Sequence, residues 1–180
     1  MERIQELRES DAKSAELAVL ESLAQELDQK ECEQELSMAR EALEINAISP
    51  VLFAEAFAQQ MERAGHGTMA VIGSVAGDRG RKTNYVYGAA KGMVERYVQG
   101  LQHRFANSKI TIVLIKPGPT ATPMTAHLPQ RGMASVEAVA SGIVAAIRSG
   151  IPVVYVPAKW AIIMMVIRHL PRSIFNKLNI

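Results

Sequence analysis

The sequence has no glycine among its first 64 residues, although 12 glycines follow from Gly65 onward. A loop that wraps around a phosphate group at the start of a helix needs glycine, because its backbone must turn tightly and come close to the ligand. The first 64 residues therefore contain no glycine-rich turn of that kind. They also contain no early run of Val and Ile that would predict a strand before residue 33.

Cysteine is almost absent as well. A single residue, Cys32, excludes an internal disulfide framework and is compatible with a reducing compartment. The first ten residues, MERIQELRES, are charged from the second position and lack the apolar core of a secretory signal. We therefore expect a cytoplasmic protein.

The chain also lacks a large excess of charge of one sign. Its net charge of +2 gives no reason to expect a nucleic acid as partner. The charges are unevenly spread, since residues 1–45 hold 13 Asp and Glu against 5 Lys and Arg, a net of −8, which leaves +10 for the rest. Leucines recur at helical intervals among these acids, so we expect residues 1–30 to form an acidic helical segment.

What is present suggests one α/β domain. The length of 180 residues and an apolar content of 48% suffice for a single core. A helical pattern runs from Glu33 to Ala64, is interrupted by Pro50 and ends at Gly65. Strands at 68–72, 110–115 and 152–156 then alternate with helices at 84–105 and 135–148, the second of which Ser135 is expected to cap. These strands are rich in Val and Ile, which favours a parallel sheet covered by helices on both faces. We divide the chain into the acidic segment 1–30, a core 31–157 and an apolar, basic tail 158–180.

Tyr87 and Lys91 form the first candidate site. They are four residues apart in an expected helix, so the phenol and the ammonium share one face. A neighbouring cation favours the phenolate, which suits a tyrosine acting as a general acid or base. An isolated pair at this spacing is more often a plain surface feature.

Two further polar residues stand at positions where ligands bind or protons move. Ser74 follows the strand 68–72, at the carboxyl end where open α/β sheets bind ligands, although most loop serines only cap a turn. Asn46 lies four residues before Pro50, which has no N–H to give to the carbonyl of Asn46. That carbonyl could accept from a water or a lysine, and the alternative is a plain proline kink.

The segment from Lys116 to Met124, KPGPTATPM, follows the strand 110–115. Its prolines make it stiff, and the hydroxyl of Thr122 could reach a flat polar ligand, although Pro-Gly after a strand is usually a turn. Residues 124–133 follow as a loop or as a disordered segment.

Residues 33–157 resemble the short-chain dehydrogenase/reductase family. The resemblance is carried by the order and spacing of Asn46, Ser74, Tyr87 with Lys91, and PGPTAT. The resemblance implies a Rossmann-like, doubly wound parallel sheet and an NAD(H) or NADP(H) cofactor. It also implies a reaction that interconverts a carbonyl and a secondary alcohol.

The resemblance assigns a role to each site residue. Tyr87 would exchange a proton with the substrate oxygen, Ser74 would hold that oxygen, and Lys91 would contact the nicotinamide ribose and acidify Tyr87. Asn46 would position a relay water. The residues that would face the nicotinamide are Pro117, Gly118, Thr120 and Thr122.

The family begins with a strand and a glycine-rich turn, which this sequence lacks before Gly65. We therefore expect an N-terminally truncated member with a sheet incomplete at its N-terminus. The resemblance does not choose between NAD and NADP, because that choice is made in the same missing part. The alternative to an enzyme is an inactive remnant that acts as a membrane-associated or oligomerising scaffold.

The tail from Lys159 carries four Lys or Arg, no acid, and eight apolar residues, WAIIMMVI. Eight residues are too few to span a bilayer, so residues 159–180 are either a helix lying on a membrane surface, with Trp160 and Phe175 as anchors, or a buried or dimer contact. A resemblance to reductases that act on a decaprenyl-phosphate-linked keto-pentose is carried by residues 74–91, SVAGDRGRKTNYVYGAAK, and by the tail. The substrate would then be a small-molecule carbonyl or a lipid-linked sugar. We also expect a homo-oligomer, and the four scattered histidines predict no metal site.

Overall fold

A computed structural model describes residues 29–122, 125 and 131–178 of the chain. The expected acidic segment 1–30 lies outside these residues except for its last two, as does most of the expected loop 124–133. The N-terminal helices are α2 (Gln29–Gln34), α3 (Leu36–Leu43), the π-helical η1 (Glu44–Ile48) and α4 (Ser49–Ala64). They are followed by β1 (His66–Ile72), the 3₁₀ turn η2 (Val75–Asp78), α5 (Tyr85–Arg104), β2 (Lys109–Pro117), α6 (Val136–Ser149), β3 (Val153–Val156), α7 (Lys159–His169) and α8 (Arg172–Phe175).

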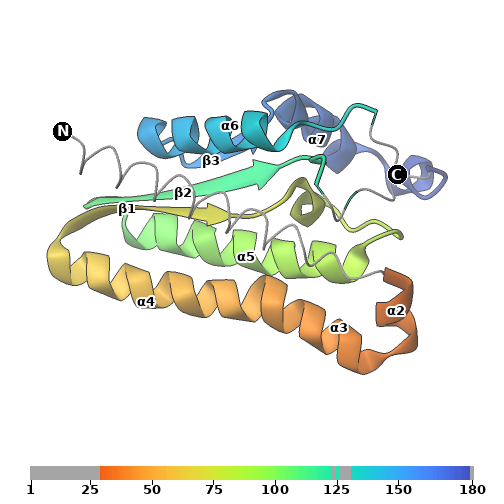
Figure 1. Ribbon diagram of the computed structural model, residues 1–180, viewed down its shortest axis with the longest axis horizontal. Helices are drawn as coiled ribbons and strands as arrows, with labels where there is room; N and C mark the ends of the chain where they lie inside the picture. Colours follow the sequence, from red (N-terminus) through yellow and green to blue (C-terminus); the bar gives the residue numbers. More distant parts are fainter. Residues whose placement is uncertain (1–28, 123–124, 126–130, 179–180) are drawn as a thin grey trace.

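The strands form one parallel sheet in the order β1-β2-β3. Helices α4 and α5 cover one face and α6 and α7 the other, so the described residues form three layers (Figure 1). This arrangement confirms the predicted α/β class with a parallel sheet and helices on both faces.

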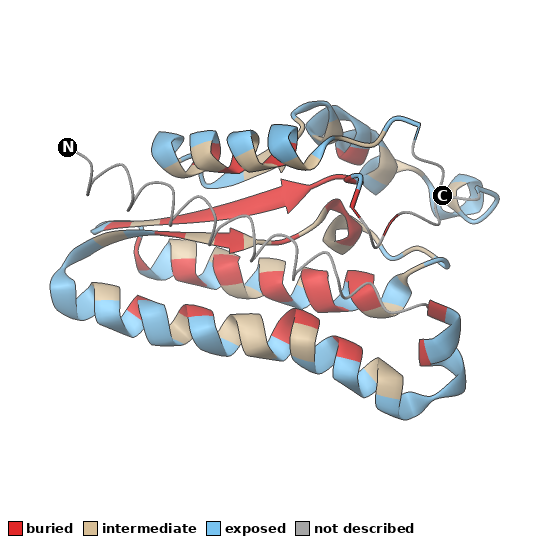
Figure 2. Cartoon of the chain, in the orientation of Figure 1, coloured by how far each residue is buried: buried red, intermediate tan, exposed pale blue. Residues whose placement is uncertain are grey.

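Strand β2 supplies both layers of the core. Ile110, Ile112 and Leu114 pack with α4 and α5, whereas Val113 and Ile115 pack with α6. Because successive side chains of a strand point to opposite faces, a strand covered on both sides needs apolar residues at every position. Figure 2 shows β2 as the most continuously buried element. The four consecutive apolar residues from Ile112 to Ile115 therefore reflect burial on both faces.

Two of the predicted helix ends are confirmed. Gly65 ends α4 with φ at 76°, a left-handed conformation that glycine adopts without steric cost. Ser135 caps α6, because its side chain accepts a hydrogen bond from the amide of Ala138 at 3.2 Å.

The predicted interruption of the helix at Pro50 is wrong, because the helical chain continues past it. Pro50 lies in the first turn of α4, where the missing N–H is tolerated. The helical chain continues through a π-helical turn, in which the amide of Ser49 donates to the carbonyl of Glu44, five residues back. The proline therefore widens the helix just before it and does not break it.

Candidate active site

The site is built on two chain segments that leave the sheet at the same edge. Ile72 of β1 is in register with Ile115 of β2, and the amide of Gly73 donates to the carbonyl of Ile115 at 2.7 Å. Because the strands are parallel, the turn that begins with Ser74 and the loop that follows Lys116 emerge side by side. This is the edge where ligands bind in open α/β sheets.

Tyr87 and Lys91 lie in the N-terminal half of α5, and both are buried, with 8% and 2% of their surface exposed. The Lys91 ammonium is 5.5 Å from the centre of the Tyr87 ring. The two side chains thus lie on one face of the helix, as their spacing predicts.

Burial lowers the pKa of Lys91 from 10.5 to about 8. At neutral pH this lysine therefore remains mostly charged, and it loses its proton more readily than an ordinary lysine. A buried cation beside a phenol stabilises the phenolate, which is the electrostatic requirement for a tyrosine that exchanges protons near neutrality.

Two glycines let η2 pack directly against the turn of α5 that holds this pair. A Cβ at Gly77 would lie 2.9 Å from the backbone carbon of Lys91, and a Cβ at Gly88 would lie 3.0 Å from the carbonyl oxygen of Ala76. Any side chain at either position would force the two backbones apart. The close approach brings the turn that begins at Ser74 against the helix of Tyr87 and Lys91.

Ser74 is the N-cap of η2, and its hydroxyl oxygen accepts a hydrogen bond from the amide of Ala76 at 3.1 Å. The structural role weighed from the sequence, that of a turn cap, is therefore observed. A hydroxyl that accepts one hydrogen bond keeps its own hydrogen to donate. Capping therefore fixes the direction of the Ser74 side chain and is compatible with a hydrogen bond to a substrate oxygen.

Asn46 lies within η1 and is 2% exposed. Its side-chain amide donates to the carbonyl of Ala42 at 3.1 Å. Helix α5 contacts η1 and η2, so Asn46 and Ser74 belong to elements that meet on the same helix. Its expected role in holding a relay water stays a prediction.

The loop after β2 is held by its own hydrogen bonds. The amide of Gly118 donates to Val156 at 2.9 Å, the hydroxyl of Thr120 donates to the carbonyl of Gly118 at 3.0 Å, and Thr125 donates to the carbonyl of Thr120 at 2.7 Å. Thr122 is 7% exposed and its hydroxyl lies 3.3 Å from that of Thr125. The two threonine hydroxyls therefore bond within the loop, which makes it stiff.

Trp160 of α7 covers part of this loop. A Cβ at Gly118 would lie 2.0 Å from the indole nitrogen of Trp160, so only glycine fits there. Pro117, which precedes it, is the last residue of β2 and is in register with Val156. The position of the loop thus depends on α7 as well as on the sheet.

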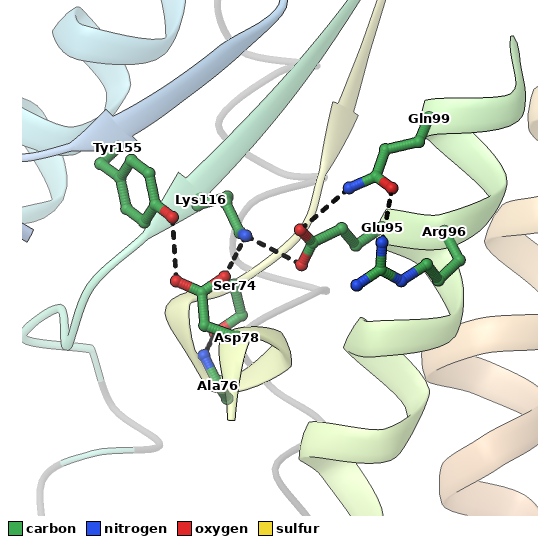
Figure 3. A network of polar contacts seen from close by, with 8 residues as sticks. All are labelled: Ser74, Ala76, Asp78, Glu95, Arg96, Gln99, Lys116 and Tyr155. Atoms are coloured by element: carbon green, nitrogen blue, oxygen red, sulfur yellow. Dashed lines mark hydrogen bonds and ion pairs between the residues drawn. The ribbon is translucent and has the colours of Figure 1, made fainter. Parts of the chain in front are cut away.

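Sequence reasoning missed a buried polar network next to these residues. Lys116, which is 1% exposed, forms ion pairs with Asp78 of η2 and, at 2.8 Å, with Glu95 of α5 (Figure 3). The hydroxyl of Tyr155 in β3 donates to the other oxygen of Asp78 at 2.9 Å. Four elements are therefore joined at one cation.

Burial pulls the pKa of Lys116 down, but its hydrogen bonds to Asp78 and Glu95, together with their charges, outweigh burial and raise that pKa above its usual value. The ion pairs thus keep Lys116 charged inside the protein. The network holds the Ser74 turn, the Tyr87 helix and the loop after β2 in fixed relative positions.

A signal for the network was present in the sequence. Lys116 directly follows the apolar stretch from Ile112 to Ile115, and a lysine is almost never fully buried without a partner. After residue 45 the chain has only five acids, and Asp78 and Glu95 are two of them. The pairing could have been suspected, but partners 38 and 21 residues away cannot be chosen without the fold.

The chain is similar to known oxidoreductases over much of its length. The family described as short chain dehydrogenase matches residues 12–132. A protein of Streptomyces coelicolor described as an uncharacterized oxidoreductase is 30% identical over 118 residues, which are 66% of this chain and 47% of that protein. An uncharacterized oxidoreductase of Mycobacterium tuberculosis is 29% identical over 154 residues, 84% of this chain and 61% of that protein. The chain thus spans about half to three-fifths of the length of these relatives.

Solved structures agree on the fold. A short chain dehydrogenase from Burkholderia cenocepacia in complex with NADP superposes with a TM-score of 0.71 at 19% identity, covering 81% of this chain and 61% of that one. A short-chain dehydrogenase from Sphingobium yanoikuyae in complex with NADPH gives a TM-score of 0.64 at 20% identity, covering 79% and 61%. These likenesses establish a Rossmann-like fold for the described part of the chain. Since the family match extends over most of the sequence, the chain belongs to the short-chain dehydrogenase family.

Proposed function

We propose that this chain carries the proton-transfer site of an oxidoreductase that interconverts a carbonyl and a secondary alcohol with NAD(H) or NADP(H). The observation that carries the proposal is the close packing of η2 on α5, because it places the Ser74 turn against the helix turn that holds the buried Tyr87 and Lys91. A hydroxyl, a phenol and a buried ammonium are the donors that carbonyl reduction needs.

In this proposal Tyr87 gives a proton to the carbonyl oxygen, or takes one from the alcohol. Ser74 donates a hydrogen bond to the same oxygen, and its cap to Ala76 fixes the direction from which it does so. The Lys91 ammonium lies beside the Tyr87 ring and favours the phenolate that remains after proton transfer. Asn46 would hold a water that restores the proton to Tyr87.

The residues present fit the nicotinamide end of the cofactor. The donor set there is the hydroxyl of Tyr87 and the ammonium of Lys91, with the backbone of Pro117, Gly118, Thr120 and Thr122 to face the ring. When bound, the nicotinamide would supply or accept the hydride. The phosphate end has no matching glycine-rich turn before Gly65.

For the substrate we propose a small-molecule ketone, and more finely a lipid-linked sugar ketone. This finer proposal is supported by α7, which covers Gly118 with Trp160 and exposes apolar side chains beyond it. A lipid-linked substrate would then meet the protein at a membrane surface through residues 159–180.

We also propose a homo-oligomer in which α4 meets a second copy. Leu52, Phe53 and Phe57 of α4 are 64%, 66% and 61% exposed, a large apolar face for a helix in water. Glu55 points toward α5 instead, where it pairs with Arg104 at 3.0 Å, so these three side chains form an uncharged face. A second copy would remove this face from water.

The competing function is a scaffold without activity, which the absence of a glycine-rich turn before Gly65 favours. Turnover separates the two. We would follow NADPH and NADH oxidation with a panel of small ketones, comparing the unaltered chain with Tyr87→Phe. The matched control is Tyr85→Phe, two residues away on the same helix and 46% exposed.

The enzyme proposal predicts that Tyr87→Phe lowers kcat by about 100-fold or more, since general acid–base catalysis contributes that much, while Tyr85→Phe retains activity. Equal rates in both variants would exclude Tyr87 as the proton donor. Absence of turnover by the unaltered, folded chain with every ketone would favour the scaffold.

A further inference from the structure

The outer faces of α7 and α8 carry a cluster of exposed apolar side chains. Ile162, Met165 and Val166 of α7 are 66%, 57% and 53% exposed, and Ile174 of α8 is 49% exposed. Residues 162, 165 and 166 are three and four positions apart, so they form one stripe along α7. An exposed apolar stripe of this kind is typical of a contact with a partner or with lipid.

The stripe is not the face by which α7 attaches to the domain. Met164, on the opposite side of the helix, is 1% exposed and makes that attachment. Trp160 packs against Gly118. Met164 and Trp160 therefore attach α7 to the domain, and the stripe takes no part in this attachment.

Arg79, which follows η2 directly, fixes the end of α7. Its guanidinium donates to the carbonyl of Leu170 at 2.8 Å and to that of Ile167, and it lies 3.8 Å from the centre of the Phe175 ring. Arg79 thus caps the carboxyl end of α7 and holds α8. Trp160 and Phe175, expected from the sequence as membrane anchors, are used in these internal contacts instead.

The charges around the stripe all have one sign. Lys159, Arg168, Arg172 and Lys177 are exposed, and residues 159–178 include no Asp or Glu. A second copy of the chain meeting this face about a twofold axis would bring two segments of four cations together, which electrostatic repulsion opposes. A surface with an apolar interior and anionic groups on its outside would bury the stripe and pair with the cations.

We infer that the exposed faces of α7 and α8 dock on an anionic lipid bilayer, with Ile162, Met165, Val166 and Ile174 entering the interface and the cations contacting headgroups. None of the described helices is long and apolar enough to cross a membrane. Docking in the plane of the surface needs only one apolar face, and it would place the loop at Gly118 beside the lipid. This surface does not depend on the oxidoreductase activity proposed above.

The test is co-flotation of the purified chain with vesicles of phosphatidylcholine alone or mixed with phosphatidylglycerol. Neither cofactor nor substrate is needed, so the result stands apart from any measurement of turnover. We expect binding to the anionic vesicles that weakens as salt is added, and much less binding to the neutral ones.

Two sets of substitutions divide the contributions. Ile162→Gln/Met165→Gln/Val166→Gln should weaken binding to anionic vesicles by about tenfold or more, because it removes the apolar face. Arg172→Gln/Lys177→Gln should weaken it by roughly 5- to 25-fold and leave the neutral vesicles unaffected. The matched control, Leu36→Gln/Met93→Gln/Ile151→Gln, removes side chains that are 84%, 48% and 54% exposed elsewhere and should bind as the unaltered chain does.

The inference is overturned if the unaltered chain does not float with anionic vesicles, or if the control substitutions weaken binding as much as those on α7. It is also overturned if the α7 substitutions turn a dimer into a monomer, by sedimentation, without affecting vesicle binding. That last result would make the face a contact between two copies.

Discussion

The Lys116 ammonium lies 2.8 Å from the Glu95 carboxylate, which joins the carboxyl end of β2 to the face of α5 that carries Lys91 (Figure 3). Glu95 is one helical turn beyond Lys91, so a shift of α5 along the sheet would separate this pair. The same ammonium holds Asp78, four residues after Ser74. One buried cation therefore links the segments that carry Ser74 and Lys91, in addition to the close packing at Gly77 and Gly88.

Lys116→Met should lower the free energy of unfolding by about 3–5 kcal/mol at pH 7, because two largely buried carboxylates lose their cation. Urea unfolding measures the change. Since the folded-state pKa of Lys116 is raised, its contribution is fully present below the ordinary lysine pKa and is lost only as the pH rises through the folded-state value. Lys109→Met, on an exposed lysine at the other end of β2, should change stability by less than about 0.5 kcal/mol. Similar losses in both variants would refute a special role for Lys116.

Gly77→Ala should separate η2 from α5, because its Cβ would lie 2.9 Å from the backbone of Lys91. We expect a loss of about 1–3 kcal/mol in stability and a lower kcat with any ketone that is reduced. Gly80→Ala, three residues further along the chain, is the matched control, since a Cβ there meets nothing within 4 Å. A Gly77→Ala protein as stable and as active as Gly80→Ala would contradict the close packing.

Lys91→Met should make the fold more stable at pH 7, by about 3 kcal/mol at most, although it removes a proposed cofactor contact. The reason is that burial lowers the folded-state pKa of Lys91 to about 8, so holding the charged form inside the protein costs free energy at neutral pH. As the pH rises from about 8 toward the ordinary lysine value, the folded state releases its proton first and the unaltered chain gains stability. The advantage of Lys91→Met should therefore shrink over that range in thermal unfolding. A difference that does not change with pH would show that the charge on Lys91 is not its source.

Arg79→Ala should loosen α7 and α8, because the carbonyls of Ile167 and Leu170 lose their donor and Phe175 loses the guanidinium above it. Hydrogen exchange at amides 160–178 should become roughly 10- to 100-fold faster. The reason is that the hydrogen bonds of the Arg79 guanidinium oppose local unfolding of these helices. Arg63→Ala, on the exposed side of α4, should leave these amides unchanged. Unchanged exchange in Arg79→Ala would mean that other contacts hold the C-terminal helices.

The sequence was informative where one local pattern decides the structure. The three strands, α5 and α6 were predicted with ends within three residues, because apolar runs, Gly65 and the Ser135 cap act locally. The prediction at Pro50 was wrong because the sequence does not show that a π-helical turn precedes this proline. With that turn, Pro50 lies at the start of the next helix and the helical chain continues.

The contacts between elements could not be read from the sequence. Lys116, Asp78, Glu95 and Tyr155 come from four elements, and only the sheet register and the packing of α5 bring them together. The contact of Arg79 with α7 could not be read from the sequence either. Its partners are backbone carbonyl groups, which every residue has. The candidate site residues were found through their order and spacing.

The most direct test of the proposed active site is a fluorescence titration of the purified, folded chain with NADPH and NADH, comparing Lys91→Ala with the exposed-lysine control Lys109→Ala. The account predicts saturable binding of at least one cofactor, weakened in Lys91→Ala and unchanged in Lys109→Ala. Absence of binding to both cofactors, or equal binding in both variants, would contradict it.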